Sequence, residues 1–208
     1  MLHTDHRFSQ AVEAAVTEIE VRTDAEVVVV AAAASGSYRD VCLLVGAVAA
    51  WATLAFVLYT PWHFEGTWLA VELPIVMALF TFAAGRSPTL VRRLTSRARR
   101  EAQVQAAARA AFLEESVHGT PRRNAVLVYV SALEDTVVVL PDSGLLATMP
   151  LAEVNGLRFG AGPDPRAPGD LDHFVSGLRA LGEVLHRHAP PVVGDNVDTI
   201  PNAPRIRS

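Results

Sequence analysis

Two long apolar stretches, separated by a short polar segment, constrain this 208-residue chain more than any other feature. The first runs from Val41 to Tyr59, and its 19 residues would span roughly 28 Å as a helix, close to the thickness of a bilayer's hydrocarbon core. The second runs from Gly66 to Gly85 and is interrupted only by Glu72 and Pro74. We therefore expect a transmembrane helical hairpin over residues 41–85. The alternative is a pair of buried core helices in a soluble protein.

The charges flanking these stretches predict their orientation. The segment Thr60 to Thr67 contains no arginine, whereas six arginines crowd the exit of the second stretch: Arg86, Arg92, Arg93, Arg97, Arg99 and Arg100. The positive-inside rule then places both chain termini in the cytoplasm, with two spans in a cytoplasmic (inner) membrane and the lipid bilayer as a partner. The acidic first 40 residues do not resemble a secretory signal.

Composition excludes several classes of protein. The single cysteine, Cys42, excludes a disulfide framework and a zinc cluster built from cysteines. A net charge of −4 argues against nucleic acid as the main partner. The arginine-rich segment also lacks interleaved aromatic residues between Arg86 and Arg109, which a surface for stacking bases would need. We therefore expect no nucleic-acid partner.

The segments on either side of the hairpin alternate between helical and strand patterns. Apolar residues recur at spacings of three and four from Phe8 to Ile19, which predicts an amphipathic helix. Glu26 to Ala33 is a continuous apolar run, typical of a strand buried on both faces. After the hairpin we expect a helix from Pro88 to about Val117, antiparallel strands at Ala125–Val130 and Val137–Leu140, a turn at Pro141–Gly144, a short helix near Leu151 and a last helix from Asp170 to His188. The long helix would bury Leu94, Ala98, Val104, Ala108, Ala111 and Phe112.

These elements predict one α/β domain interrupted by the hairpin. A lone strand at residues 26–33 cannot bury both faces, so we expect it to pair with residues 125–130. Residues 1–40 and 86–189 then form the domain, residues 41–85 the hairpin, and residues 190–208 a disordered tail rich in Pro, Asp and Asn.

A set of short motifs, in this order, resembles the TPM domain family. They are Thr23-x-Ala25-Glu26, Ser35-Gly36-x-Tyr38, Ala111-Phe112, His118-x-Thr120-x-x-Arg123, and then Glu134, Asp142 and Gly144. The similarity covers roughly residues 8 to 188. It departs from the family at Asn124-Ala125, where a Thr-Gly pair is expected, and at Pro141, where Ala is common.

The resemblance implies a mixed sheet sandwiched by helices, with a transmembrane hairpin inserted after the first strand in membrane members. Related proteins are implicated in photosystem repair, receptor modulation and, in some plant members, phosphatase activity. The resemblance therefore implies a fold and a membrane location more directly than a reaction.

Two functions from different classes remain. The first is a non-enzymatic interaction or assembly module with a membrane-protein partner. The second is a metal-dependent phosphatase with Asp142 as a ligand of a divalent cation, calcium or magnesium, and with Glu134, Asp135, His118 and Arg123 as further candidates. The structural interpretation of these residues is a turn at Asp142, a helix cap at His118 and Thr120, and pairing of Arg123 with Glu26 or Glu134. A transporter component would depend on Glu72 alone.

Overall fold

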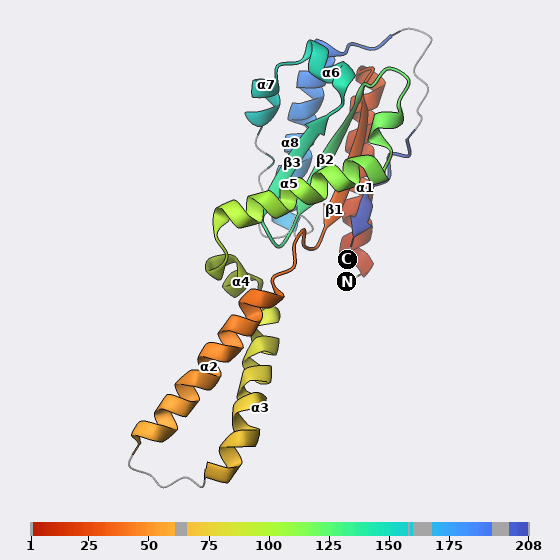
Figure 1. Cartoon of the computed structure of the whole chain (residues 1–208). Helices are drawn as coiled ribbons and strands as arrows, with labels where there is room; N and C mark the ends of the chain where they lie inside the picture. Colours follow the sequence, from red (N-terminus) through yellow and green to blue (C-terminus); the bar gives the residue numbers. More distant parts are fainter. Residues whose placement is uncertain (1, 61–65, 158, 160–167, 193–199, 208) are drawn as a thin grey trace. The chain divides into compact units, whose positions relative to one another are not determined.

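The computed structural model describes residues 2–60, 66–157, 159, 168–192 and 200–207. Contacts between residues divide the chain into two units. Unit 1 comprises Met1–Ser35 and Glu101–Ser208, and unit 2 comprises Gly36–Arg100. Unit 1 contains a sheet with helices, and unit 2 contains the two apolar helices (Figure 1).

The sheet of unit 1 has four strands in the order β3-β2-β1-β4. The strands are β1 (Glu26–Ala32), β2 (Ala125–Ser131), β3 (Thr136–Pro141) and β4 (Arg205–Arg207). β1 is parallel to both β2 and β4, while β2 and β3 are antiparallel. The sheet is therefore mixed, and the predicted pairing of residues 26–33 with 125–130 is confirmed, with Glu26 opposite Ala125.

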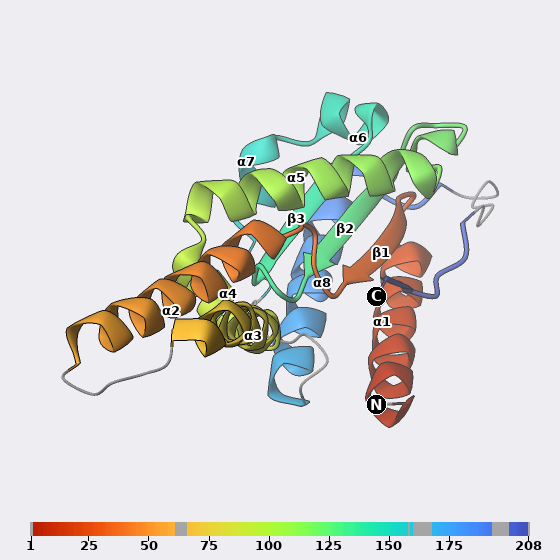
Figure 2. The ribbon, with the colours of Figure 1, turned by 60° about the horizontal axis from the view of Figure 1, so that its bottom comes forward.

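Helices cover both faces of this sheet. One face packs against α1 (Leu2–Arg22) and α8 (Pro168–His188), and the other packs against α5 (Arg97–Glu114) and the short 3₁₀ helix η1 (Val117–Gly119). Figure 2 shows the strands between α5 on one side and α1 and α8 on the other. Because successive side chains point to opposite faces, Val27 and Val29 join the first core while Val28 and Val30 join the second. Every residue of β1 and β2 is buried, which confirms the prediction that residues 26–32 form a strand buried on both faces.

The prediction of one long helix from Pro88 to about Val117 is wrong, because the helix is interrupted. The structure has α4 (Pro88–Leu94), α5 and η1 in its place, with a break at Thr95. Thr95 is extended, and the Ser96 hydroxyl accepts the Arg99 backbone N–H at 3.3 Å, so this polar pair caps a new helix rather than continuing the old one. Leu94 and Ala98, predicted to be buried, are exposed because they lie beside this break. Val104, Ala108 and Ala111 are buried as predicted.

Unit 2 is built on a helical hairpin. α2 (Arg39–Tyr59) and α3 (Gly66–Gly85) lie side by side (Figure 1). Gly46 brings them into close contact, because a Cβ atom there would lie 2.2 Å from Thr81 Oγ1 and 2.5 Å from the Met77 carbonyl oxygen. By length and composition, Arg39–Tyr59 and Trp68–Gly85 are apolar enough to cross a membrane.

The predicted disordered tail is wrong at its end. Residues 193–199 lie outside the described residues, but Arg205–Arg207 form β4 at the sheet edge beside β1. Glu115 accepts hydrogen bonds from Arg205 at 3.1 Å and from Arg207 at 2.7 Å, and Glu114 also pairs with Arg207 at 2.7 Å. These bonds, first of all the one to Glu115, raise the pKa of Arg207 and tie β4 to the end of α5.

Candidate functional site

The residues singled out in the sequence lie at opposite ends of the sheet. β1 and β2 begin at Glu26 and Ala125, and β3 returns to the same end at Pro141. That end carries Glu26, His118, Thr120, Arg123, Asp142 and Gly144, and we call it the Asp142 end. Glu134 follows β2 at the other end, which we call the Glu134 end. The predicted candidates therefore form two clusters rather than one.

Strand register places Glu26 and Asp142 on the same face of the sheet. Ala125 lies between them, since it pairs with Glu26 and its carbonyl oxygen accepts the Asp142 N–H at 2.9 Å. Ala125 belongs to the core that faces α5 and η1. Glu26 and Asp142 lie opposite Ala125 in the sheet, so their positions are on the same face. The strands carrying them are two spacings apart, about 10 Å. Both carboxylates are buried, at 8% and 6% exposure.

Asp142 caps a helix, whereas the sequence predicted a turn. Ser143 and Gly144 belong to α6 (Ser143–Thr148), which is followed by α7 (Leu151–Asn155). Asp142 Oδ1 accepts the Ser143 backbone N–H at 2.7 Å, and the backbone of Asp142 has the extended conformation typical of a helix cap. Asp142 Oδ2 is buried, has no hydrogen bond from the described residues, and lies 4.0 Å from Arg123 Nη1.

Gly144 is required at its position by a close approach of two backbone segments. Its N–H donates to the Arg123 carbonyl oxygen at 2.9 Å. A Cβ atom on Gly144 would lie 2.4 Å from the carbonyl oxygen of Arg122 and 2.6 Å from that of Arg123. Arg123 itself adopts a positive φ of 55°, which presents this carbonyl to α6. The arrangement sets Arg123, whose side chain is 53% exposed, beside Asp142. Arg123 therefore lies at the end opposite Glu134, and the predicted pairing with Glu134 is wrong.

Three polar residues that sequence reasoning did not select hold the Asp142 end together. The Arg122 Nη1 atom lies 2.9 Å from Asp24 Oδ1, and the Asn124 amide donates to the Asp24 carbonyl oxygen. These bonds tie the segment before β2 to the segment before β1. Among these three residues, only Asn124 was noted in the sequence, as a departure from the motifs that the chain resembles.

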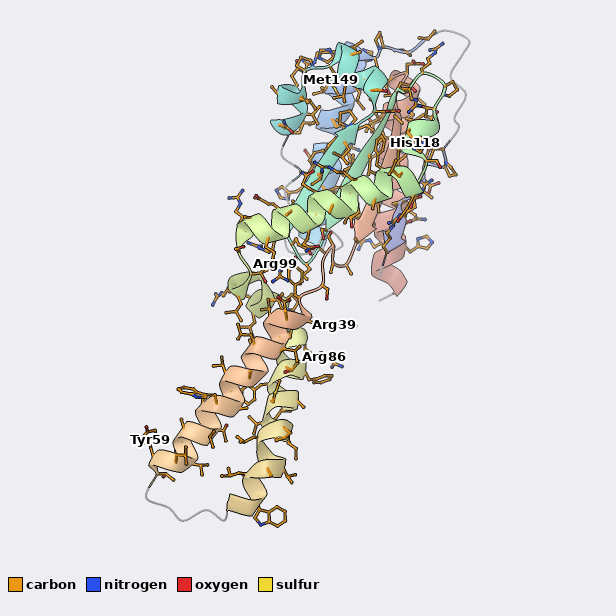
Figure 3. The ribbon with its side chains drawn as sticks, viewed as in Figure 1. Arg39, Tyr59, Arg86, Arg99, His118 and Met149 are labelled. Atoms are coloured by element: carbon orange, nitrogen blue, oxygen red, sulfur yellow. The ribbon has the colours of Figure 1, made fainter. Side chains whose placement is uncertain are left out.

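His118 and Thr120 leave two further polar atoms buried here. The His118 ring stacks on Phe112 with centroids 6.4 Å apart, and Figure 3 shows its position beside α5. His118 Nδ1 and Thr120 Oγ1 are buried and have no hydrogen-bond partner among the described residues. Buried polar atoms without a protein partner commonly bind ordered water molecules.

No group of three His, Cys, Asp or Glu side chains that could hold a metal ion is found in the part of the chain that the structure describes. A divalent cation on Asp142 stays a prediction, and most of its ligands would have to be water molecules or backbone oxygens.

Glu134 at the other end is the centre of a buried hydrogen-bond network. Its side chain is 2% exposed and accepts the Ser35 backbone N–H at 3.0 Å and the Ser131 hydroxyl. Ser35 Oγ lies 2.6 Å from Ser131 Oγ and 3.2 Å from the Tyr129 hydroxyl. Sequence reasoning missed Ser131 and Tyr129, which share the face of β2 that packs on α5. Glu134 therefore joins the segment after β1 to the turn after β2.

Comparisons with known proteins give a fold and no family. No protein-family model matches the chain, and no curated protein matches it. Among solved structures, the NMR structure of BA42 protein from the psychrophilic bacterium Bizionia argentinensis is similar, with a TM-score of 0.54 and 15% sequence identity. The match covers 96% of this chain and 92% of that chain. At this identity the likeness establishes the fold alone.

Proposed function

We propose that this chain is a membrane-anchored, TPM-like protein that serves as a non-enzymatic interaction or assembly module at the cytoplasmic face of the membrane. The exposed apolar surface of α2 and α3 carries the proposal. In the most apolar 18 residues of each helix, only 11% and 6% are buried. A core helix would be mostly buried, and apolar surface of this extent needs lipid or a partner protein to cover it.

The two ends of the hairpin unit differ in a way that supports the proposed orientation. Tyr59 and Trp68 are 90% and 65% exposed at the end near the connecting segment, where interfacial aromatic residues would anchor it. Figure 3 shows Arg39, Arg86 and Arg99 at the opposite end. An arginine-rich end belongs on the cytoplasmic side.

Two carboxylates of the family motifs already serve the fold, which favours an interaction module. Glu134 accepts hydrogen bonds from Ser35 and Ser131, and Asp142 caps α6. The buried Glu134 carboxylate is bonded through both oxygens, so it is not available as a nucleophile or a general base without breaking those bonds.

Cysteine accessibility in intact bacterial cells tests the anchoring and its orientation. With Cys42→Ser as background, Tyr59→Cys reports on the connecting end of the hairpin and Gln105→Cys on the exposed side of α5. We expect a membrane-impermeant maleimide to label the Tyr59→Cys chain in intact cells and the Gln105→Cys chain only after permeabilisation. Extraction of the chain by alkaline carbonate, or labelling of Gln105→Cys in intact cells, contradicts the proposal.

The interaction role has its own test. A photo-reactive residue placed at exposed Leu151 should give one dominant crosslinked membrane protein in cells, and the same residue at exposed Leu113 is the matched control. Equal crosslinking at both positions, or none at either, contradicts a defined partner on the α7 side of unit 1.

One observation favours the phosphatase as a second candidate. Asp142 Oδ2 has no hydrogen bond from the described residues and lies beside the half-exposed Arg123 guanidinium, a pairing that suits a cation and a phosphate. Hydrolysis of p-nitrophenyl phosphate with magnesium or calcium, lost in Asp142→Asn, would support it. Equal rates in both chains, or no hydrolysis, would remove this candidate.

A further inference from the structure

We propose that the arginine-rich end of unit 2 binds the phosphate groups of anionic phospholipids. We call its six arginines, Arg39, Arg86, Arg92, Arg93, Arg97 and Arg100, the arginine belt. The inference deepens the proposed membrane anchoring and rests on it. It assigns to these residues a defined ligand, beyond a role in orientation.

The belt carries charge that its own unit does not balance. Residues 36–100 contain seven arginines and three acidic residues, which are Asp40, Glu65 and Glu72. Glu65 and Glu72 lie toward the other end of the hairpin sequence, so the acids close to the arginines in sequence are Asp40 and Glu101, which directly follows Arg100. Arg99 binds Asp40 through two hydrogen bonds of 2.7 and 2.9 Å. Seven arginines against two acids leave this end of the hairpin sequence with an excess of positive charge.

The Asp40–Arg99 ion pair links two helices at the arginine-rich end of unit 2. Arg99 also lies 5.7 Å from the centre of the Tyr38 ring and contacts the Ser37 carbonyl oxygen. The pair joins the first turn of α2 to the first turn of α5, and it raises the pKa of Arg99. Arg99 therefore has a structural role in unit 2, and it is not counted in the arginine belt.

Arg86 occupies the position expected at a lipid headgroup. It is exposed, follows directly after α3, and its guanidinium lies 4.4 Å from the centre of the Phe82 ring. Phe82 is itself 61% exposed on the apolar helix. An exposed ring at the end of an apolar helix, covered by a cation, fits the boundary between acyl chains and phosphates.

α4 adds a second pairing of apolar and cationic side chains. Val91 is buried, while Arg93 and Leu94 are exposed on the same short helix, Leu94 to 53%. Figure 1 shows α4 beside the start of α2 and the end of α3. A leucine exposed among arginines is unfavourable in water but is accommodated at a membrane surface.

These apolar neighbours favour a lipid over the other polyanions. A nucleic acid would need aromatic residues for stacking, and the sequence has none between Arg86 and Arg109. A free phosphate would draw no benefit from Phe82 or Leu94. A phospholipid and a free phosphate both present a phosphate anion, but only the phospholipid has acyl chains that can contact these apolar side chains.

The test counts lipids bound to the full chain in neutral detergent by native mass spectrometry. The protein is mixed with equal amounts of phosphatidylglycerol and phosphatidylcholine with matched acyl chains, and then with glycerol phosphate as the free anion. We expect phosphatidylglycerol to be preferred, and the Arg86→Gln/Arg93→Gln chain to bind it about fivefold more weakly for each charge removed. Arg109→Gln, an exposed arginine of unit 1, is the matched control and should keep the preference.

Each other result overturns the inference. Retained preference in the double variant, or an equal loss in Arg109→Gln, shows that the belt is not the site. Displacement of the lipid by glycerol phosphate shows a site for free anions. Release of the chain from membranes by carbonate removes the proposed anchoring and this inference together, whereas an anchored chain without lipid preference removes the inference alone.

Discussion

The carboxylate of Glu134 accepts the backbone N–H of Ser35, a residue 99 positions earlier in the chain, with its two oxygens 3.0 and 3.1 Å from that nitrogen. Ser35 is the last residue of unit 1 before unit 2 begins. The bond therefore holds the end of the β1 segment at the point where the chain leaves the sheet. It is a contact between two loops that a local sequence pattern does not specify.

Removing this carboxylate should destabilise unit 1. In Glu134→Ala, the Ser35 N–H and the Ser131 hydroxyl lose their acceptor, and each buried unsatisfied group costs about 1–3 kcal/mol. We expect a clear fall in the free energy of unfolding, measured by denaturant titration in mild detergent. Glu13→Ala, at an exposed position of α1, is the control, and an equal effect of both substitutions would contradict the role of Glu134.

Gly46 should not tolerate a side chain. In Gly46→Ala the new Cβ would lie 2.5 Å from the Met77 carbonyl oxygen, a backbone atom that cannot rotate away. Overpacking of this kind costs about 1–3 kcal/mol, more than the helix propensity that alanine adds. Thermal melting in detergent should show the loss. Gly85→Ala is the matched control, because its Cβ would lie at an ordinary 3.9 Å from Cys42 Sγ. Equal melting temperatures of the two variants would refute a close helix contact at Gly46.

Gly144 should be equally intolerant, for a reason specific to the Asp142 end. Gly144→Ala forces its Cβ against the carbonyl oxygens of Arg122 and Arg123, at 2.4 and 2.6 Å. The segment before β2 must shift, and we expect a loss of about 1–3 kcal/mol in the free energy of unfolding. Gly119→Ala would meet only the Ser116 Cβ at 3.8 Å and should melt like the wild type.

Two substitutions of Asp142 should distinguish its role as a helix cap from the effect of its negative charge. Alanine removes the acceptor of the Ser143 N–H and should cost about 1 kcal/mol, whereas asparagine retains a capping oxygen and should cost much less. Denaturant titration of both variants checks this. If Asp142→Asn unfolds as readily as Asp142→Ala, the carboxylate charge beside Arg123 matters more than the cap.

Deleting residues 205–208 should expose the edge of β1. The ion pairs of Arg205 and Arg207 with Glu115 are partly exposed, so each contributes at most about 1 kcal/mol. The larger effect should be association, because an uncovered edge strand can pair with a second chain. Size-exclusion chromatography in detergent should show larger species for the shortened chain. The full-length Arg207→Gln chain should elute like the wild type, and unchanged elution of the shortened chain would contradict the protective role of β4.

Sequence alone determined the elements whose signal is local. The valines of residues 27–30 predict a buried strand because β-branched side chains favour extended backbone, and the apolar lengths at residues 41–59 and 66–85 predict long helices whatever surrounds them. The pairing of β1 with β2 also followed, because a single buried strand needs a partner, whereas its parallel direction came from the structure.

Only the tertiary structure decided the features that join distant residues. Arg205–Arg207 is too short to be a strand by itself and becomes one by pairing with β1. The helix break at Thr95 depends on competition between a capping hydroxyl and a weak helical preference, which sequence patterns do not resolve. Strand direction separates Glu134 from Asp142. Glu134 follows the end of β2, whereas Asp142 follows β3, which runs antiparallel to β2 and ends beside the start of β2. Local preference depends on neighbours in sequence, whereas a site depends on which strand ends the fold brings together.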